Sequence, residues 1–420
     1  MTNRKKKYNN QYAFAQTFLR VVIIVLIILV LVAAFMIFKK NSSGSEGSVS
    51  VHGSNLDPDA IFTDTATDAD TLSPITFDAK TRAHTVDIQP NALYNGFELP
   101  IDGATGYVGT TVNVYQNPDK SSSSIIAMGM GDCFTILADT DDGWLQIKSG
   151  SVIGWVESKM CFVNLPDVIP SIIYKNTNAS SSIYTSSLYS IPGVTGENLY
   201  VVSNKTHNAR LGREEYIIIS LYGTAKKICA AQQIALKAGY TLVMHEAYRP
   251  CDVQEKIYKG LKALMNKNSK VKAGVSNDTW STTWFASTGK GSHQYGYAFD
   301  ANLEHVESCT SVTVGKYTVV CPYETTSTDM PSPMHELSVM SITYAYPYSS
   351  VKSTGWRSVP FAESMTDDAK LFRYICTEAG FTPLASEWWH FNDLDARSAT
   401  SSKAADGNFY PSVCLSTLPD

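Results

Sequence analysis

The chain has 420 residues, a formal net charge of −5 and 44% hydrophobic residues. This length allows two or three domains, and the apolar share is large enough to form hydrophobic cores. The slightly acidic balance argues against nucleic-acid binding, which usually requires a basic surface.

The first feature along the chain is an uninterrupted apolar run at residues 21–38. Its length meets the roughly 18 residues expected of a membrane-spanning helix. The run is longer than the apolar core of a cleaved signal peptide, and no small-x-small cleavage pattern follows it before Lys39. We therefore expect a single uncleaved transmembrane anchor at residues 21–38.

The charges on either side of this run predict its orientation. Basic residues up to Arg20 outnumber the pair Lys39 and Lys40 that follows. The positive-inside rule then keeps residues 1–20 in the cytoplasm as a basic tail and sends the rest of the chain outside the cell membrane. Residues 41–75 are rich in Ser, Gly, Asp and Thr, a composition typical of a flexible linker.

Residues 106–165 contain short stretches of alternating apolar residues separated by turn residues. Close-spaced short strands of this kind predict a small all-β barrel. The segment also resembles a bacterial SH3-like domain, through Asn113-Val114, Gly131-Asp132, Gly143-Trp144 and Gly154-Trp155-Val156. In that family such modules commonly bind cell-wall peptides or act as spacers. We expect Trp144 and Trp155 in the barrel core, and a ligand platform is the alternative.

Residues 166–200 give no firm assignment, and the pattern beyond them is mixed. We expect a helix at 221–238, a buried strand at 240–247 and a second helix at 252–265. Thr366 is expected to cap a further helix whose first turn is acidic and which ends at Gly380. Helices and strands without regular βαβ alternation predict an α+β domain, which we place at residues 200–420.

The eight cysteines are an even number, and an exported chain can keep disulfides. Cys309 and Cys321 flank a β-branched run around Gly315-Lys316, a pattern that predicts a hairpin. A disulfide between these two cysteines and free buried thiols both remain open.

Two short segments carry the chemistry. His293 and Asp300 lie seven residues apart with Gly296 between them, and Glu387 lies three residues before His390. The Asp belongs to a strand-like apolar run, where a carboxylate is costly unless it is paired or binds a metal. Two histidines and one carboxylate make an open zinc site with a fourth position for water or substrate. Glu387 would then be the base for a metal-activated water.

Arg249 follows the end of the predicted strand and precedes a Pro, a position that fixes a cationic side chain at the lip of a cleft. Its planar guanidinium suits a carboxylate or a developing oxyanion. A surface salt bridge is the alternative role.

Together these segments resemble the zinc D-alanyl-D-alanine carboxypeptidases and dipeptidases of the vancomycin-resistance type, over about residues 200–400. The matching motifs are Tyr248-Arg249-Pro250, His293-x-x-Gly296-x-Ala298-x-Asp300 and Glu387-Trp388-Trp389-His390. The resemblance implies a compact α+β zinc-peptidase domain with the metal in a cleft on a small antiparallel sheet.

Carried over to these positions, the resemblance makes His293, Asp300 and His390 the Zn²⁺ ligands. Glu387 would take a proton from the attacking water and pass it to the leaving amine. Arg249 would hold the oxyanion or the scissile carbonyl.

Two positions depart from the family pattern. Gly291 stands where the family has a Ser that contacts substrate, so Ser292 is the candidate for that contact. His335 stands where the dipeptidases have an Asp that contacts the free amine of a dipeptide. We expect His335 in the substrate site, and a site without that carboxylate should favour a peptide tail over free D-Ala-D-Ala.

The expected function is therefore a membrane-anchored, extracellular zinc D,D-carboxypeptidase that removes the terminal D-Ala of peptidoglycan stem peptides. Its expected partners are these peptides, the membrane and, through the barrel, the cell wall, with no nucleic acid. The alternatives are a D-Ala-D-Ala dipeptidase, a cross-link endopeptidase and a non-catalytic wall-binding protein.

Overall fold

The computed structural model describes residues 88–175, 194, 205–277 and 279–420. All of these belong to one compact unit of the chain, residues 64–420. The predicted cytoplasmic tail, anchor and linker lie outside the described residues. Among the residues that are described, no helix is long and apolar enough to cross a membrane.

The first half of the described chain is all β, as the sequence predicts. Its strands are β1 (Thr105–Val108), β2 (Val112–Tyr115), β3 (Ser124–Met128), β4 (Cys133–Asp139), β5 (Trp144–Ser149), β6 (Val152–Glu157) and β7 (Cys161–Asn164). They pair in the order β7-β1-β4-β5-β6-β2-β3, and every pairing is antiparallel. Alternate residues of each strand point inward, and Val114, Ile136, Leu145, Ile147 and Val156 form a fully buried core.

The core position predicted for Trp144 and Trp155 is wrong. Leu145 and Ile147 occupy the inward positions of β5, so Trp144 faces outward and is half-buried. Trp155 is also half-buried on β6, and its strand partner is Tyr115. The ring of Tyr115 meets that of Trp144 edge to face, with centroids 5.7 Å apart. Three aromatic side chains therefore line one outer face of the barrel.

The second half mixes helices and strands. Its strands are β8 (Ile173–Tyr174), β9 (Lys205–Asn208), β10 (Arg213–Tyr216), β11 (Ile219–Leu221), β12 (Tyr240–Glu246), β13 (Ala298–Val314), β14 (Tyr317–Ser327), β15 (Thr382–Pro383) and β16 (His390–Asn392). Its α-helices, with the short one that joins the two halves, are α3 (Leu165–Val168), α4 (Tyr222–Lys237), α5 (Cys251–Lys267), α6 (Ser269–Val275), α7 (Thr282–Phe285), α8 (Asp367–Glu378) and α9 (Leu394–Thr400). The predicted helices and strand of this half are confirmed to within about two residues.

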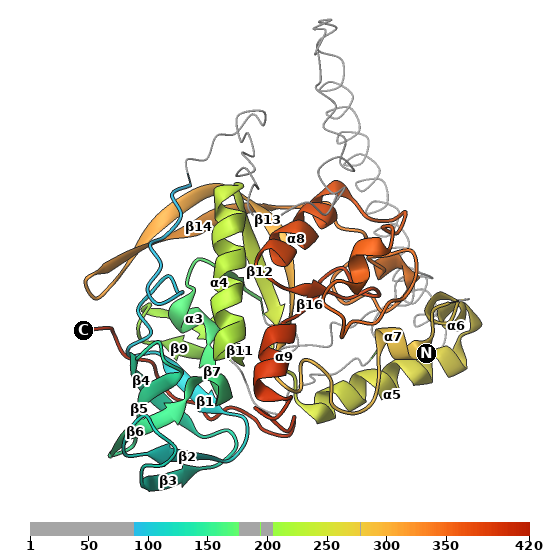
Figure 1. Cartoon of the computed structure of the whole chain (residues 1–420). Coiled ribbons are helices and arrows are strands. Elements are labelled where there is room, and N and C mark those ends of the chain that lie inside the picture. The colour runs from blue at the N-terminus through green and yellow to red at the C-terminus, as the bar shows by residue number, and fades with distance from the viewer. Residues whose placement is uncertain (1–87, 176–193, 195–204, 278) are drawn as a thin grey trace, which may run out of the picture. The chain divides into compact units, whose positions relative to one another are not determined.

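The central sheet of this half has the order β15-β16-β13-β12-β8, and β14 pairs with β13. Helix α4 packs on β12 and on α8 (Figure 1). Thr366 caps α8, because its hydroxyl accepts the backbone N–H of Ala369 at 3.2 Å. Glycines with positive φ follow the two helices, Gly239 after α4 and Gly380 after α8, and Gly380 is where the sequence predicts that the second helix ends.

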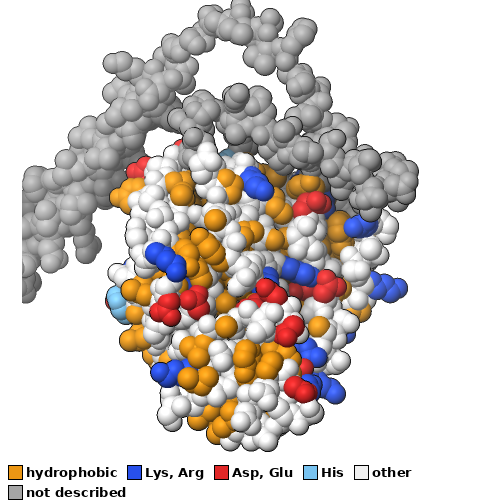
Figure 2. All heavy atoms as spheres, turned by 60° about the vertical axis from the view of Figure 1, so that its left-hand side comes forward, with side chains coloured by type: hydrophobic (Ala, Val, Ile, Leu, Met, Phe, Trp, Pro, Cys, Tyr) orange, Lys and Arg blue, Asp and Glu red, His pale blue; other side chains and the backbone are white. Residues whose placement is uncertain are grey.

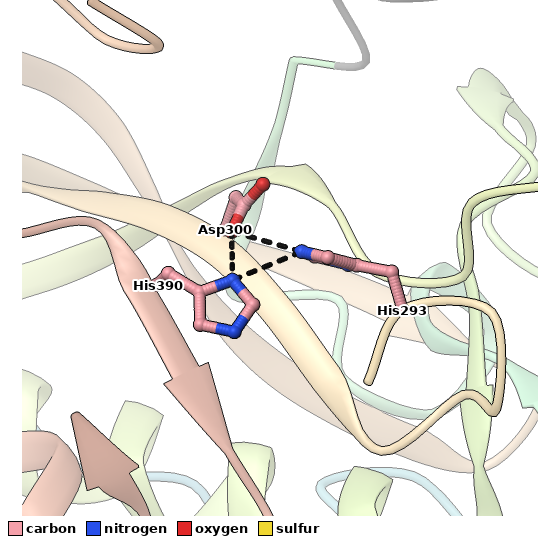
Figure 3. A group of neighbouring side chains, drawn as sticks. All are labelled: His293, Asp300 and His390. Carbon is pink, nitrogen blue, oxygen red and sulfur yellow. Dashed lines mark hydrogen bonds and ion pairs between the residues drawn. The ribbon is translucent and has the colours of Figure 1, made fainter. Parts of the chain in front are cut away.

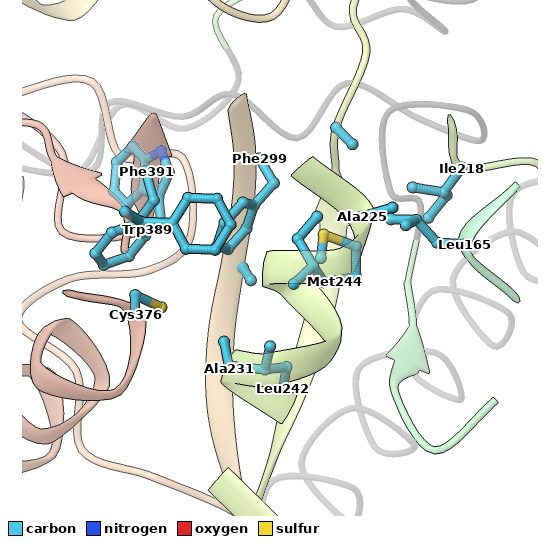
Figure 4. Close-up of a cluster of buried hydrophobic side chains, with 14 of the residues drawn as sticks. Leu165, Ile218, Ala225, Ala231, Leu242, Met244, Phe299, Cys376, Trp389 and Phe391 are labelled. Carbon is cyan, nitrogen blue, oxygen red and sulfur yellow. The ribbon is translucent and has the colours of Figure 1, made fainter. Parts of the chain in front are cut away.

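The main core joins the two helices to this sheet. Phe299 of β13, Trp389 and Phe391 lie on the α8 side, and Leu242 and Met244 of β12 lie beside α4 (Figure 4). The same cluster continues into the barrel, for example to Val163 of β7. Because one core includes residues of both halves, the barrel packs against the α+β half.

Two further connections join the halves. Strand β11 pairs antiparallel with β7, so a strand of the second half extends the barrel sheet. The C-terminal segment also returns to the barrel, where Ser412 donates its N–H to Gly131 at 3.0 Å and Thr417 donates to Gly103 at 2.9 Å.

The surface shown in Figure 2 carries Lys, Arg, Asp and Glu side chains interspersed with one another. Hydrophobic side chains reach the surface on its lower part, where the barrel lies. Ile125, Met130 and Ile153 of the barrel are between 43% and 52% exposed.

The predicted hairpin between Cys309 and Cys321 is confirmed as β13 and β14, and Gly315 at its turn has φ +58°. Cys309 lies opposite Pro322, whereas Cys321 lies opposite Thr310. This register puts the two thiols on opposite faces of the hairpin. All eight cysteines lie among the described residues and are free.

The buried carboxylate of Glu98 should make the free energy of unfolding depend on pH. Glu98 is 1% exposed and accepts hydrogen bonds from Ser171 N at 3.0 Å and Gln233 Nε2 at 2.7 Å. Burial, partly offset by these hydrogen bonds, raises its pKa to about 7. The folded state therefore holds this proton more tightly than the unfolded state, and stability falls as pH rises from about 4.5 to about 7.

Glu98→Gln should remove that loss, because the amide is neutral at every pH. We expect the variant to be more stable than the wild type by about 2–3 kcal/mol at about pH 8, with little or no gain at about pH 5. Urea unfolding at the two pH values measures the difference. The exposed Glu363 provides the control variant Glu363→Gln, and an equal gain at both pH values would contradict the prediction.

Candidate metal centre

The fold brings together three side chains that are far apart in sequence. Asp300 of β13 lies directly opposite His390 of β16 in the sheet. His293 lies in a turn at 292–296 immediately before β13, and Gly296 N donates to His293 O at 3.0 Å to close this turn. Figure 3 shows the three side chains pointing toward one another.

The spacing of their ligand atoms suits a tetrahedral zinc site. His293 Nε2 lies 3.0 Å from His390 Nδ1 and 3.2 Å from Asp300 Oδ1. His390 Nδ1 lies 2.9 Å from Asp300 Oδ1. Ligands about 2.0–2.1 Å from a tetrahedral zinc ion are about 3.3 Å from one another. These three atoms are therefore close to the separation that zinc requires.

The tautomers of the two histidines fit the same ion. His293 Nδ1 lies 2.5 Å from the carbonyl oxygen of Ala247, and His390 Nε2 lies 3.1 Å from Asn392 Oδ1. Both oxygens are acceptors, so the outward nitrogens keep their protons when a metal binds, and loss of the inward protons would leave two lone pairs aimed at the ion. Together with Asp300 Oδ1 they would form three electron-rich atoms around one point, an arrangement that a cation stabilises.

Asp300 uses its two oxygens differently. Oδ1 faces the histidines, while Oδ2 accepts a hydrogen bond from Arg249 Nη2 at 2.9 Å and lies 3.3 Å from His335 Nε2. Burial would raise the pKa of Asp300, but the charge of His293 and hydrogen bonds from the neighbouring imidazoles lower it well below its usual value. The carboxylate is therefore ionised although it is fully buried.

Arg249 is buried beside the site, and the alternative of a surface salt bridge is wrong. Its side chain is 8% exposed. Nε donates to Glu246 Oε2 at 2.8 Å, Nη1 donates to Gln254 Oε1 at 2.6 Å, and Nη2 also contacts Glu246. The guanidinium is thus fixed in position by buried acceptors, with its charge directed at Asp300.

Glu387 lies next to the three converging atoms. A turn in which His390 N donates to Glu387 O places its Oε2 4.0 Å from His390 Nδ1, and its side chain is 14% exposed. Burial, together with the charge of Asp300, raises the pKa of Glu387 to about 7. A carboxyl group with this pKa can both accept and deliver a proton near neutral pH.

The two residues predicted to contact substrate lie against the three converging side chains. Ser292 is half-buried, with its hydroxyl 3.3 Å from His390 Nε2. The substrate contact expected of His335 is not what the structure shows, because its ring is 0% exposed and lies behind Asp300. The loop that carries it folds inward, so it reaches the carboxylate from the side away from the histidines.

Sequence reasoning missed three residues that support the site. Glu246 and Gln254 fix Arg249, and Asn392 fixes the ring of His390. Asn392 could have been found, because it lies two residues after His390 and therefore on the same face of a strand. Glu246 lies in a buried strand, where a carboxylate needs a partner such as Arg249 three residues later.

The turn that carries His293 rests on the barrel. Gly296 has φ +79°, and a Cβ added there would overlap the ring of Phe162 in β7. Gly296→Ala should destabilise the protein by about 2–4 kcal/mol, through backbone strain and the forced shift of the ring. It should also weaken zinc binding, because His293 must move with the turn.

Thermal unfolding and a zinc titration measure these two effects. Gly291→Ala is the matched control in the same segment, because its added Cβ would meet only the flexible side chain of Gln294, at 3.2 Å. Equal stability of the two variants would show that the contact with Phe162 is unimportant.

Comparisons with known families agree with this geometry. Residues 110–160 match the model of the bacterial SH3 domain, and residues 222–322 match the model of D-alanyl-D-alanine carboxypeptidase. The second match includes Arg249, His293 and Asp300 and ends before Glu387 and His390. No curated protein matches the chain. The family indicates a peptidase that acts on D-Ala-D-Ala. The chain thus contains a bacterial SH3 domain followed by a domain of the D-alanyl-D-alanine carboxypeptidase family.

Proposed function

We propose that this protein is a membrane-anchored, outward-facing zinc D,D-carboxypeptidase that removes the terminal D-Ala from peptidoglycan stem peptides. The observation that carries the proposal is the convergence of His293, Asp300 and His390, with Glu387 beside them, in a chain that matches the carboxypeptidase family. We also propose that this domain has the α+β fold of the zinc D,D-peptidases.

A zinc ion held by His293, Asp300 and His390 would polarise the scissile carbonyl and lower the pKa of a water molecule. Glu387 accepts the proton of the attacking water and delivers it to the nitrogen of the leaving D-Ala as the amide C–N bond breaks. The charge of Arg249, fixed by Glu246, stabilises the negative charge that develops on the carbonyl oxygen. No covalent bond between protein and substrate is needed.

The rest of the chain supports a substrate in the cell wall. An apolar anchor at residues 21–38 would keep the site outside the cell, where stem peptides are found. The outward aromatic face formed by Tyr115, Trp144 and Trp155 is our candidate for contact of the barrel with the wall.

Mass spectrometry of digested peptides tests the proposal. The purified protein, loaded with zinc, is incubated with a stem pentapeptide that ends in D-Ala-D-Ala, and the expected product has lost a single D-Ala. The same peptide with a terminal L-Ala is the control and should stay intact. An uncut pentapeptide in the presence of the zinc-bound protein would contradict the proposal.

Other substrates separate the alternatives. Cleavage of free D-Ala-D-Ala alone would indicate a dipeptidase, and cleavage of cross-linked muropeptides would indicate an endopeptidase. Binding to isolated cell walls while every substrate stays intact would indicate a non-catalytic wall-binding protein.

A further inference from the structure

We propose that His335 is a positioning residue that, together with Arg249, holds Asp300 so that a single carboxylate oxygen faces the metal centre. The inference rests on the proposed function for the identity of the metal. It concerns how this chain orients Asp300 as a metal ligand, and it gives His335 a role other than contact with substrate.

The hydrogen bonds divide the two oxygens of Asp300 cleanly. Oδ1 lies within 3.2 Å of the inward nitrogens of both His293 and His390. Oδ2 lies 2.9 Å from Arg249 Nη2 and 3.3 Å from His335 Nε2. Each oxygen thus has its own pair of neighbours, and the donors on Oδ2 oppose any rotation of the carboxylate toward two-oxygen binding.

The hydrogen bond between His335 and Asp300 can run in only one direction. An ionised carboxylate accepts hydrogen bonds and cannot donate them, so Nε2 of His335 carries the proton and donates it. This holds whether the ring is neutral or charged. Since His335 and Asp300 are both 0% exposed, solvent does not supply a substitute donor, and a buried oxygen that loses a donor loses stabilisation.

The backbone of the loop that carries His335 is strained. His335 has φ +60°, a left-handed conformation that is uncommon for residues other than Gly. Its ring packs edge to face against Trp389, with centroids 5.6 Å apart. Such a conformation persists only where neighbouring contacts fix it.

The contacts that fix the loop come from the turn that carries Glu387 and His390. Trp388 Nε1 donates to Ser332 Oγ at 3.0 Å, and Trp388 N donates to Ser341 O at 3.0 Å. The two serine hydroxyls lie 2.8 Å apart. The position of His335 is therefore tied to the segment that supplies the base and one ligand.

A zinc ion with three protein ligands and one open position needs a carboxylate that binds through one oxygen. Without the His335 donor, Asp300 keeps only Arg249 on Oδ2 and is freer to turn. Removal of such supporting hydrogen bonds typically weakens metal binding about 10- to 100-fold.

Two matched variants test this role in the purified full-length protein. His335→Gln keeps an N–H donor at similar reach, whereas His335→Met keeps a similar length and volume without a donor. Both place an unbranched side chain on the same strained backbone. Zinc affinity is measured by competition with a chromophoric chelator, and the visible spectrum of the cobalt-substituted protein reports coordination geometry. Thermal unfolding of the metal-free proteins reports folding.

We expect His335→Met to bind zinc about 10- to 100-fold more weakly and to change the cobalt spectrum. His335→Gln should stay within about threefold of the wild type, and the two metal-free variants should unfold at similar temperatures. Wild-type affinity and spectrum in His335→Met would overturn the inference, and so would equal losses in both variants, which would indicate packing alone.

These measurements need no substrate. A wild type that binds zinc but cuts no peptide would refute the proposed function and leave the role of His335 to be judged by affinity. A wild type that binds no zinc would overturn both.

Discussion

Glu387→Gln should slow D-Ala release by roughly 10²- to 10⁴-fold while zinc stays bound. The amide keeps the shape of the carboxyl group but cannot take a proton from water. In the wild type, burial raises the pKa of this group to about 7, and activity requires the ionised form. Activity should therefore fall as pH drops below the pKa of Glu387, which a bound cation would lower.

Kinetics across pH and metal analysis of the same samples check this prediction. In Glu387→Gln, most of the rate of D-Ala release should be lost, and the remaining rate should no longer fall at acidic pH. The exposed Glu363 again supplies a control, and Glu363→Gln should keep full activity. Loss of zinc from Glu387→Gln would instead identify Glu387 as a ligand, and near-normal hydrolysis would remove it from the mechanism.

Asp300→Asn should weaken zinc binding and also destabilise the metal-free protein. Zinc binds such sites with a free energy of about 10–16 kcal/mol. If four ligands contribute equally, the loss of one ligand weakens binding roughly 10²- to 10³-fold. The substitution also removes one carboxylate partner of buried Arg249, and breaking such a pair costs about 3–5 kcal/mol. The metal-free variant should therefore be less stable than the metal-free wild type.

Chelator competition measures the first effect, and urea unfolding in the presence of a chelator measures the second. Asp395→Asn is the control, because that side chain is 87% exposed. Unchanged zinc affinity in Asp300→Asn would contradict the metal site, whereas unchanged stability would show that Glu246 alone compensates Arg249.

The part of the site that the sequence predicts is formed by residues that lie close together along the chain. The spacing of His293 and Asp300, with Gly296 between them, and the strand-like run that contains Asp300 are visible in the sequence. Local patterns do not predict the pairing of Asp300 with His390, because 89 residues separate them and only packing brings β16 beside β13. The family resemblance predicted the combination, which periodicity could not.

The barrel shows a second limit. The stretch from Trp144 to Ile147 has apolar residues on both faces of the strand, so alternation alone does not decide which face is buried. The core position predicted for Trp144 fails because Leu145 and Ile147 fill the narrow interior. The return of the C-terminal segment to Gly103 and Gly131 left no pattern in the sequence, because it uses backbone hydrogen bonds.

The contact between Gly296 and Phe162 bears on how such a protein can evolve. The ring of Phe162 also meets Tyr248, at 5.7 Å between centroids, so one side chain of β7 touches two motifs of the peptidase. A smaller side chain at this position of β7 would leave a gap beneath both motifs. A rearrangement of the chain that keeps both motifs packed must therefore keep β7, which follows the segment matched to the SH3 domain at residues 110–160.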